Sequence, residues 1–188
     1  TYEREGTAPR GIAVTHPANW GPYKLDLLNQ AIRQVDVDVD LTLPEPAAAA
    51  TYYASQRKLE PDATVAVYDL GGGTFDAALV RRTGTSFEVL GHPEGIERLG
   101  GIDFDEAVFA HVRESLGDTF DQLDPEESST LAAVSRLRQE CIDAKEALSG
   151  DTDVSVPVLL PNLNTEVRLT RTEFEAMIRP AVGETIVA

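Results

Sequence analysis

Cysteine is nearly absent from this sequence: Cys141 is the one cysteine among 188 residues, so no disulfide can form within the chain. This scarcity favours a reducing compartment, and we expect the cytoplasm. Long apolar runs are missing too, since none approaches the roughly 18 to 20 residues of a membrane-spanning helix. Nor do the first residues have the basic head and apolar core of a secretory leader. We therefore expect a soluble protein that makes no membrane contact through this segment.

Basic residues are scarce as well: 16 lysines and arginines face 32 aspartates and glutamates, which gives a formal charge of −16. Such a charge repels phosphate backbones, so we expect no nucleic-acid partner. A small anionic ligand remains compatible with it, because magnesium and backbone N–H groups can carry that interaction. The acidity also fits a generally soluble surface, and this is the simpler interpretation.

The hydrophobic pattern alternates between strand-like and helix-like segments and predicts an α/β fold. Expected strands cover residues 11–15, 35–43, 63–71, 75–84, 86–95, 154–161 and 165–170. Expected helices cover 22–34, 44–57, most of 100–117, 124–150 and the residues after 170. Asp124 with Pro125 predicts one helix start, and Thr170 with Glu173 predicts a capping box at another. Both chain ends adjoin structured patterns, so we expect a piece of a longer protein.

Three consecutive glycines, Gly71 to Gly73, lie between two expected strands. A hairpin turn needs only one or two glycines, whereas three allow backbone N–H groups to approach an anion closely. Asp69 would then lie beside phosphates, which is favourable only if a cation such as magnesium lies between them. Thr74 adds a hydroxyl. From spacing alone, a phosphate-binding turn and a merely tight hairpin are both open.

Two common nucleotide-binding loops do not fit this turn. A Walker-type loop ends in Gly-Lys-Ser/Thr, and the chain has no Gly-Lys pair. In the dinucleotide fingerprint a third glycine would stand where Asp76 is, and a helix rather than a strand would follow.

Several other residues have simpler structural interpretations. We expect Asp103 and Asp105 to cap the helix that follows the Gly100–Gly101 pair, and Cys141 to be an inert core thiol. The histidines share no ligand spacing, so we expect no metal role for them.

Four segments occur in a characteristic order: "EPAAAA", "DLGGGTFD", "RLGGIDFDE" and "CIDAKEALSG". This order resembles the nucleotide-binding domain of the 70-kDa heat-shock chaperones, DnaK-type members of the actin-like ATPase superfamily. The resemblance implies an actin-like, ribonuclease-H-like α/β lobe with a smaller α+β subdomain. In this scheme residues 1–44 are the end of a first lobe and its crossover. Residues 45–100 are the core of the second lobe with the glycine turn, and 101–188 are its smaller subdomain.

The resemblance also implies roles for individual residues, with ATP or ADP and Mg²⁺ as cofactors. The implied catalytic residues are Glu45, which arranges the hydrated magnesium and attacking water, Asp69, near the magnesium and its waters, and Thr74. The implied nucleotide-binding residues are Gly71, Gly72, Gly73 and Thr74 around the β- and γ-phosphates, with Lys145 and Ser149 at the adenosine.

Two positions depart from the family pattern. Ile142 replaces a glutamate that grips the adenosine, and Glu146 replaces an arginine that stacks on the adenine ring. Such stacking is worth roughly 0.5 to 2 kcal/mol. We therefore expect weaker ATP affinity or a different nucleotide preference, unless other groups hold the ring.

The resemblance favours part of a chaperone ATPase of the stress response, in which ATP binding rotates the lobes and releases polypeptide. Unfolded polypeptide and co-chaperones would bind through regions outside this chain, and the chain alone is not expected to hydrolyse ATP. A divergent nucleotide-dependent switch or scaffold with weak or no ATPase activity is the alternative. A sugar kinase or polyphosphatase relative is a third, which the wording of the glycine motif disfavours.

Overall fold

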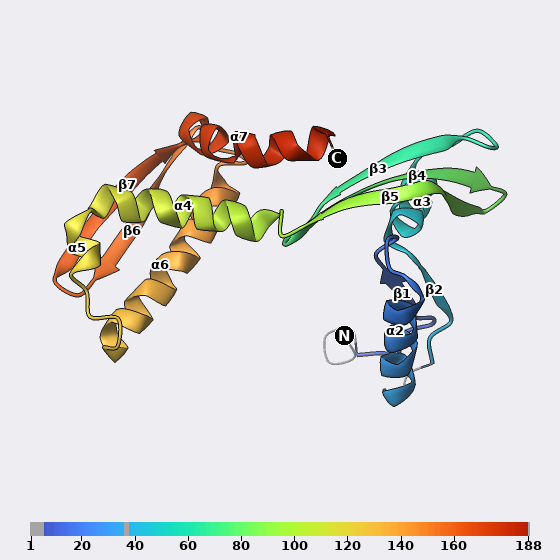
Figure 1. Cartoon of the computed structure of the whole chain (residues 1–188), viewed down its shortest axis with the longest axis horizontal. Coiled ribbons are helices and arrows are strands. Elements are labelled where there is room, and N and C mark those ends of the chain that lie inside the picture. Colours follow the sequence, from blue (N-terminus) through green and yellow to red (C-terminus); the bar gives the residue numbers. More distant parts are fainter. Residues whose placement is uncertain (1–5, 36–37, 188) are drawn as a thin grey trace. The chain divides into compact units, whose positions relative to one another are not determined.

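The computed structural model describes residues 6–35 and 38–187, and these form two compact units. Unit 1 contains the chain up to Asp69 together with Phe75–Ile96 (Figure 1). Unit 2 contains Leu70–Thr74 and the residues from Glu97 onward. The three-part division at residues 44 and 100 stays a prediction. Among the described residues, no helix has the length and apolar character needed to cross a membrane.

Unit 1 begins with a parallel strand pair joined by a helix. Strand β1 (Ala13–His16) pairs with β2 (Leu41–Pro44), so that Ala13 lies opposite Leu41. Helix α2 (Pro22–Gln34) forms the crossover that parallel strands require. It has Pro22 in its first turn, as predicted, because proline lacks the N–H that would be unpaired there. Helix α3 (Glu45–Gln56) follows β2 directly and buries Ala47 and Ala50.

The strand predicted over 35–43 is mostly wrong. Residues 36–37 lie outside the described residues, 38–40 are not strand, and β2 begins only at Leu41. The reason is that β1 begins only at Ala13, opposite Leu41, and offers no strand partner to the residues before Leu41. Asp40, the residue before Leu41, is bonded to Ile12, which precedes β1 and is not part of a strand. The Asp40 N–H donates to the Ile12 carbonyl at 2.9 Å, and the Asp40 carboxylate accepts from the Ile12 N–H at 2.7 Å. Alternation of side chains does not produce a strand where no partner is available.

A three-stranded sheet follows, in the order β3 (Thr64–Leu70), β4 (Thr74–Thr83) and β5 (Ser86–Glu97). The connections, residues 71–73 and 84–85, are short enough only for antiparallel neighbours. Phe75 and Val80 are completely buried, and the Phe75 ring lies 4.6 Å from that of Tyr68. The predicted strands on both sides of the glycine turn are therefore confirmed.

Unit 2 packs helices against a hairpin. Its elements are α4 (Gly101–Leu116), α5 (Asp118–Asp121), α6 (Ser128–Ala147), β6 (Asp153–Leu160), β7 (Leu163–Thr170) and α7 (Arg171–Val187). Strands β6 and β7 are antiparallel, with Asp153 opposite Thr170. The core is a single cluster drawn from α4, the α6 region and the hairpin: Val108, Phe109, Val112, Leu137, Cys141, Ala144, Leu148, Val156, Val158, Leu160 and Leu169. Burial raises the pKa of the Cys141 thiol to about 12, which confirms an inert core thiol.

Helix starts in unit 2 test the capping predictions. The capping box is confirmed, because the Thr170 N–H donates to Glu173 at 2.8 Å and the Glu173 N–H donates to the Thr170 hydroxyl at 3.2 Å. Asp103 also caps, since its carboxylate accepts from the Gly100 N–H at 2.8 Å. The start predicted at Asp124 is wrong: α6 begins at Ser128, and Asp124 instead accepts from the Glu126 N–H within a turn.

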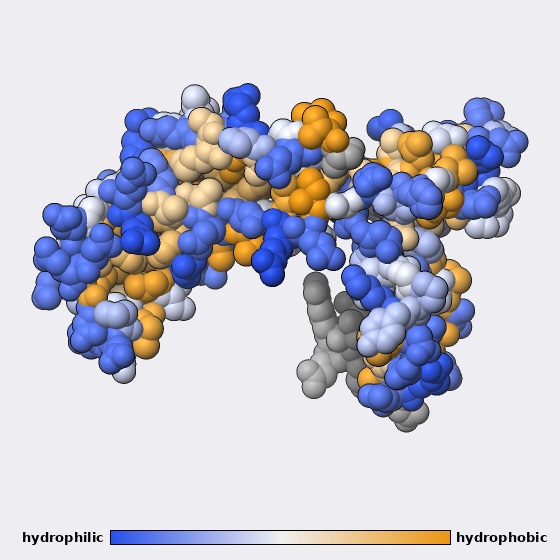
Figure 2. All heavy atoms as spheres, in the orientation of Figure 1, coloured by the Kyte–Doolittle hydropathy of each residue, from blue (hydrophilic) through white to orange (hydrophobic). Residues whose placement is uncertain are grey.

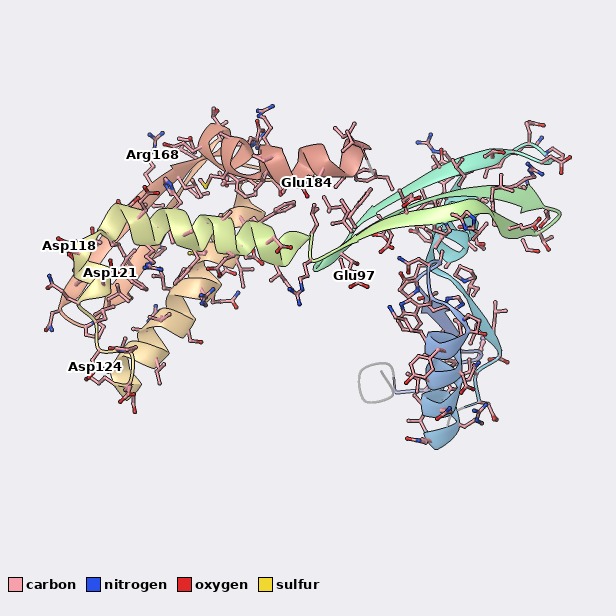
Figure 3. All side chains as sticks on the ribbon, in the orientation of Figure 1. Glu97, Asp118, Asp121, Asp124, Arg168 and Glu184 are labelled. Atoms are coloured by element: carbon pink, nitrogen blue, oxygen red, sulfur yellow. The ribbon has the colours of Figure 1, made fainter. Side chains whose placement is uncertain are left out.

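Acidic side chains lie at the surface of unit 2. Hydrophilic side chains cover much of the face of this unit seen in Figure 2, with hydrophobic side chains among them. Asp118, Asp121 and Asp124 gather around α5 (Figure 3), where Asp121 pairs with Arg113 at 3.2 Å. These exposed charges are solvated, so they serve solubility rather than a buried site.

Replacing Leu137 by alanine is expected to lower the free energy of unfolding by about 3 kcal/mol, because this 1% exposed side chain would leave a cavity. Leu131 on the same helix is 59% exposed, so Leu131→Ala should change stability by less than about 0.5 kcal/mol. Urea unfolding followed by circular dichroism measures both variants. Equal losses would contradict this assignment of the core.

Candidate functional site

The glycine turn in unit 2 contains two glycines that the protein's own packing does not require. None of Gly71, Gly72 and Gly73 has a positive φ. A Cβ atom on Gly72 would meet nothing within 4 Å, and one on Gly73 would meet only the end of the Ile102 side chain, at 3.9 Å. Among the described residues, none accepts a hydrogen bond from the N–H of Gly72 or Gly73. The turn thus combines open space at these two α-carbons with two N–H groups that no described residue pairs, a combination that is compatible with an anion-binding nest.

Gly71 and Thr74 close this turn. The Gly71 N–H donates to the Thr74 carbonyl at 2.8 Å, so this amide is already paired. A Cβ on Gly71 would lie 3.4 Å from the same carbonyl oxygen. Thr74 is exposed at the start of β4. Of the three glycine amides, those of Gly72 and Gly73 are therefore the ones available to a ligand.

A second glycine pair, Gly100 and Gly101, lies where the turn is hydrogen-bonded to the start of α4, and we call these two hydrogen bonds the latch. The Gly101 N–H donates to the Gly71 carbonyl at 2.9 Å, and the Ile102 N–H donates to the Gly72 carbonyl at 2.7 Å. A Cβ on Gly100 would lie 2.6 Å from the Gly73 nitrogen, so only glycine fits there. These residues were missed as site residues in the sequence, although the pair Gly100–Gly101 before a helix was the available signal.

Lys145 from α6 reaches this latch, whereas Ser149 lies beyond the end of the helix. The Lys145 ammonium lies 3.2 Å from the Gly101 carbonyl oxygen and 2.6 Å from the Asp105 carboxylate. The structure thus brings Lys145 beside the glycine turn. Ser149 is exposed, with its N–H bonded to the Glu146 carbonyl at 3.0 Å. The expected capping role of Asp105 is wrong, because its carboxylate pairs with Lys145 instead.

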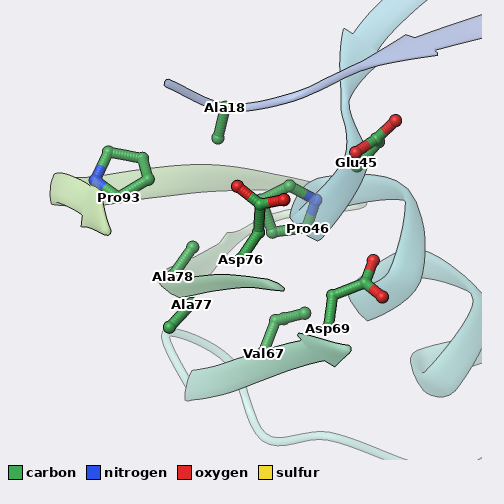
Figure 4. Close-up of a pocket in the computed structure, with 9 residues that line it drawn as sticks. All are labelled: Ala18, Glu45, Pro46, Val67, Asp69, Asp76, Ala77, Ala78 and Pro93. Atoms are coloured by element: carbon green, nitrogen blue, oxygen red, sulfur yellow. The ribbon is translucent and has the colours of Figure 1, made fainter. Parts of the chain in front are cut away.

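Three carboxylates line one small pocket in unit 1. Glu45 is the first residue of α3, Asp69 is near the end of β3, and Asp76 is on β4. Figure 4 shows their side chains around the same space, which Ala18 and Pro93 also border. Asp76 was missed in the sequence as a site residue. Asp76 follows the glycine turn and Asp69 precedes it, on two strands expected to be antiparallel neighbours. This placement was the sequence signal that could have identified Asp76.

The electrostatics of this pocket favour a cation. Burial raises the pKa of Glu45, and the negative charges of Asp69 and Asp76 raise it further, while His16 acts in the opposite direction. Within the described ranges, no three Asp, Glu, His or Cys side chains are close enough to ligate one metal ion directly. Magnesium usually keeps several of its waters and binds through one or two carboxylates, so a hydrated ion fits this donor set.

Gly95 is packed tightly against the same pocket. A Cβ at this position would lie 2.7 Å from the Asp76 carboxylate and 3.1 Å from the Asn19 amide nitrogen. The Asn19 amide in turn donates to Asp76 at 3.5 Å. The absence of a side chain at Gly95 therefore allows Asn19 and Asp76 to meet at the edge of the carboxylate group.

Comparison with known proteins gives a consistent result. Residues 11–188 match the family described as "Hsp70 protein". The chain is 39% identical over 178 residues to a "Chaperone protein HscA homolog" of Pseudomonas putida, covering 95% of this chain and 26% of that protein. Proteins of the same description match from Azotobacter vinelandii (38% identical, 95% and 26% covered) and Shewanella denitrificans (35% identical, 94% and 27% covered). The chain thus spans about a quarter of the length of these relatives.

Replacing Asp76 by asparagine is expected to lower the pKa of Glu45, because it removes one of the charges that disfavour the Glu45 carboxylate. Carbon-detected NMR titration of the Glu45 carboxyl group measures this shift. Asp26→Asn, on α2 where Asp26 accepts from Gln30, is the control and should leave the Glu45 titration unchanged. A Glu45 pKa that is the same in both variants would contradict the electrostatic coupling.

Proposed function

Because this chain belongs to the Hsp70 family, we propose that it supplies the second phosphate-binding turn and the magnesium-facing carboxylates of a chaperone ATPase. The chain is part of a nucleotide-binding domain and has its α/β, actin-like ATPase fold. ATP or ADP with Mg²⁺ is the ligand that we assign to it.

The observation that carries the proposal is the pair Gly72 and Gly73. Both lack a positive φ and both have room for a side chain, yet both are glycine. A methyl group at either position would take up open space next to the backbone of the turn. Glycine at these positions is explained if the β- and γ-phosphates of the nucleotide rest against the backbone. We assign the Thr74 hydroxyl, next in the chain, as a donor to a phosphate oxygen.

We assign magnesium to the carboxylate pocket. Asp69 would hold the ion through its water molecules, and Asp76 would add a second negative charge on the neighbouring strand. When bound, the ion would neutralise phosphate charge during transfer of the γ-phosphoryl group. Glu45, whose raised pKa reflects its carboxylate neighbours, would orient the attacking water. The residues of this chain therefore act by positioning, which is the usual contribution of a protein to phosphoryl transfer.

The adenosine contacts are assigned to Lys145 and Ser149, at the end of α6 and just after it. Ile142 is half-buried and Glu146 is exposed on the same helix. Ile142 has no charge with which to grip the adenosine, and Glu146 has no guanidinium to stack on the adenine ring, as the family pattern would require. Weaker ATP affinity, or a changed nucleotide preference, stays our prediction for this site.

For the whole protein, we propose that ATP binding and hydrolysis drive release of unfolded polypeptide, with co-chaperones acting on the cycle. This extends the printed description of the relatives, which are chaperones, to this chain. The similarity of this chain to chaperones makes a nucleotide-dependent scaffold or a sugar kinase the less favoured alternative. We further propose a cytoplasmic role in the stress response, and ATPase activity in the full-length protein rather than in this chain alone.

Calorimetric titration of Mg-ATP into the full-length protein tests the assignment directly. The wild type should release heat on binding, and Asp69→Asn should weaken binding because it removes a carboxylate from the magnesium pocket. Asp62→Asn, in an exposed loop of the same unit, is the matched control and should bind as the wild type does. Absence of binding heat in the wild type would reject the proposed function.

Gly72→Ala separates a ligand-binding role from a folding role. The alanine Cβ meets nothing within 4 Å, so the free energy of unfolding should stay the same or rise by up to about 1 kcal/mol. Mg-ATP affinity should nevertheless fall by about tenfold or more, because the methyl group blocks the approach to the amides. Gly21→Ala, equally unhindered before α2, should leave affinity unchanged. Tight ATP binding by Gly72→Ala would argue against phosphate binding at this turn.

A further inference from the structure

Asp105 and Lys145 form an ion pair that the proposed nucleotide contacts do not explain. The two side chains are only 19% and 18% exposed, and their charged atoms lie 2.6 Å apart. No described residue donates a well-aligned hydrogen bond to the buried Asp105 oxygen, so its charge is balanced by Lys145 alone. A carboxylate this well buried is costly to desolvate, and its pairing must be maintained.

The pair lies next to the hydrogen bonds that join the glycine turn to the start of α4. Lys145 comes from α6, and Asp105 stands in the second turn of α4. The Lys145 ammonium also donates to the Gly101 carbonyl at 3.2 Å. The N–H of that same Gly101 donates to the carbonyl of Gly71 in the glycine turn. One ammonium group therefore connects α6, the first residue of α4 and, through it, the turn.

The latch determines where the two unpaired N–H groups point. In a planar trans peptide, the carbonyl oxygen and the N–H of the next residue point in opposite directions. The carbonyls of Gly71 and Gly72 are fixed toward the first residues of α4. The N–H groups of Gly72 and Gly73 belong to the same two peptides, so they must point away from α4, toward the open side of the turn.

We propose that Asp105 is a positioning residue for phosphate binding: by holding Lys145 against Gly101 it fixes the start of α4, and with it the direction of the Gly72 and Gly73 amides. This inference rests on the proposed function, since it assigns phosphates to those amides. Asp105 itself touches no nucleotide. Lys145 thus holds the start of α4 in place, in addition to any contact that it makes with adenosine.

A second ion pair between the same two helices gives a matched control. Glu106 on α4 pairs with Arg138 on α6 at 2.5 Å. Both side chains are about half exposed, and among the described residues no hydrogen bond or ion pair joins either of them to Gly101 or the turn. If ion pairs merely joined α4 to α6, neutralising either acid would have a similar effect. Under the proposal, only Asp105 matters for the ligand.

The test is ADP binding to the full-length protein by calorimetry, with Mg²⁺ present. Asp105→Asn should raise the dissociation constant by about tenfold, since small displacements of preorganised donors weaken binding at a distance. Glu106→Gln should stay within about twofold of the wild type. Asp105→Glu, which keeps the carboxylate, should recover most of the lost affinity. Equal affinities in Asp105→Asn, Glu106→Gln and the wild type would overturn the inference.

Amide hydrogen exchange without nucleotide provides the independent readout. In Asp105→Asn, the Gly101 and Ile102 amides should exchange faster than in the wild type, while the amides of the β6–β7 hairpin stay protected. If Asp105→Asn does not fold, Asp105→Ala is measured in the same way. Unchanged exchange at Gly101 and Ile102 would refute the positioning role of Asp105 but would leave the proposed function untouched. A wild type that binds no ADP would instead reject the proposed function.

Discussion

The candidate site depends on two backbone hydrogen bonds from the start of α4 to the carbonyls of Gly71 and Gly72. They give partners to two helix N–H groups that would otherwise be unpaired, and they orient the turn at the same time. They are possible only because Gly100 lacks a side chain, since a Cβ there would collide with three backbone atoms of the turn. Helix start and glycine turn are thus one structural element, although the bonded residues, Gly101 with Gly71 and Ile102 with Gly72, are 30 positions apart in the sequence.

The glycines of this site serve two distinct purposes. Gly100 is required by the fold, because its neighbours leave no space. Gly72 and Gly73 are not, because theirs do. The sequence alone could not separate these cases: it predicted that close approach to the backbone was the reason for the glycine run, but a helix terminus and a ligand both approach closely. Only the positions of neighbouring atoms assign Gly100 to the helix terminus, and under the proposed function Gly72 and Gly73 are explained by the ligand.

Short-range signals in the sequence were mostly reliable, with the helix start predicted at Asp124 as the exception, whereas signals that needed a distant partner were not. The Thr170–Glu173 box and the β6–β7 hairpin depend on residues a few positions apart, and both were predicted. The strand over 35–43 failed because β1 is too short to pair with it. Asp105 was assigned to a cap because the ammonium that it pairs with comes from Lys145, 40 residues further along. Asp76 was missed for the same reason, since its role depends on the antiparallel return of β4.

The charge arrangement has a consequence for how an anion could be held by so acidic a protein. Lys145 is the cation beside the glycine turn, and Asp105 already balances it at 2.6 Å. Its remaining attraction for phosphate is therefore small, because the pair presents little net charge. Under the proposed function, attraction for phosphate at this turn must then come mainly from the fixed dipoles of the Gly72 and Gly73 amides. Magnesium that arrives with the nucleotide would, under the same proposal, lower the negative charge that these dipoles have to hold, whereas a simple anion would bring no such compensation.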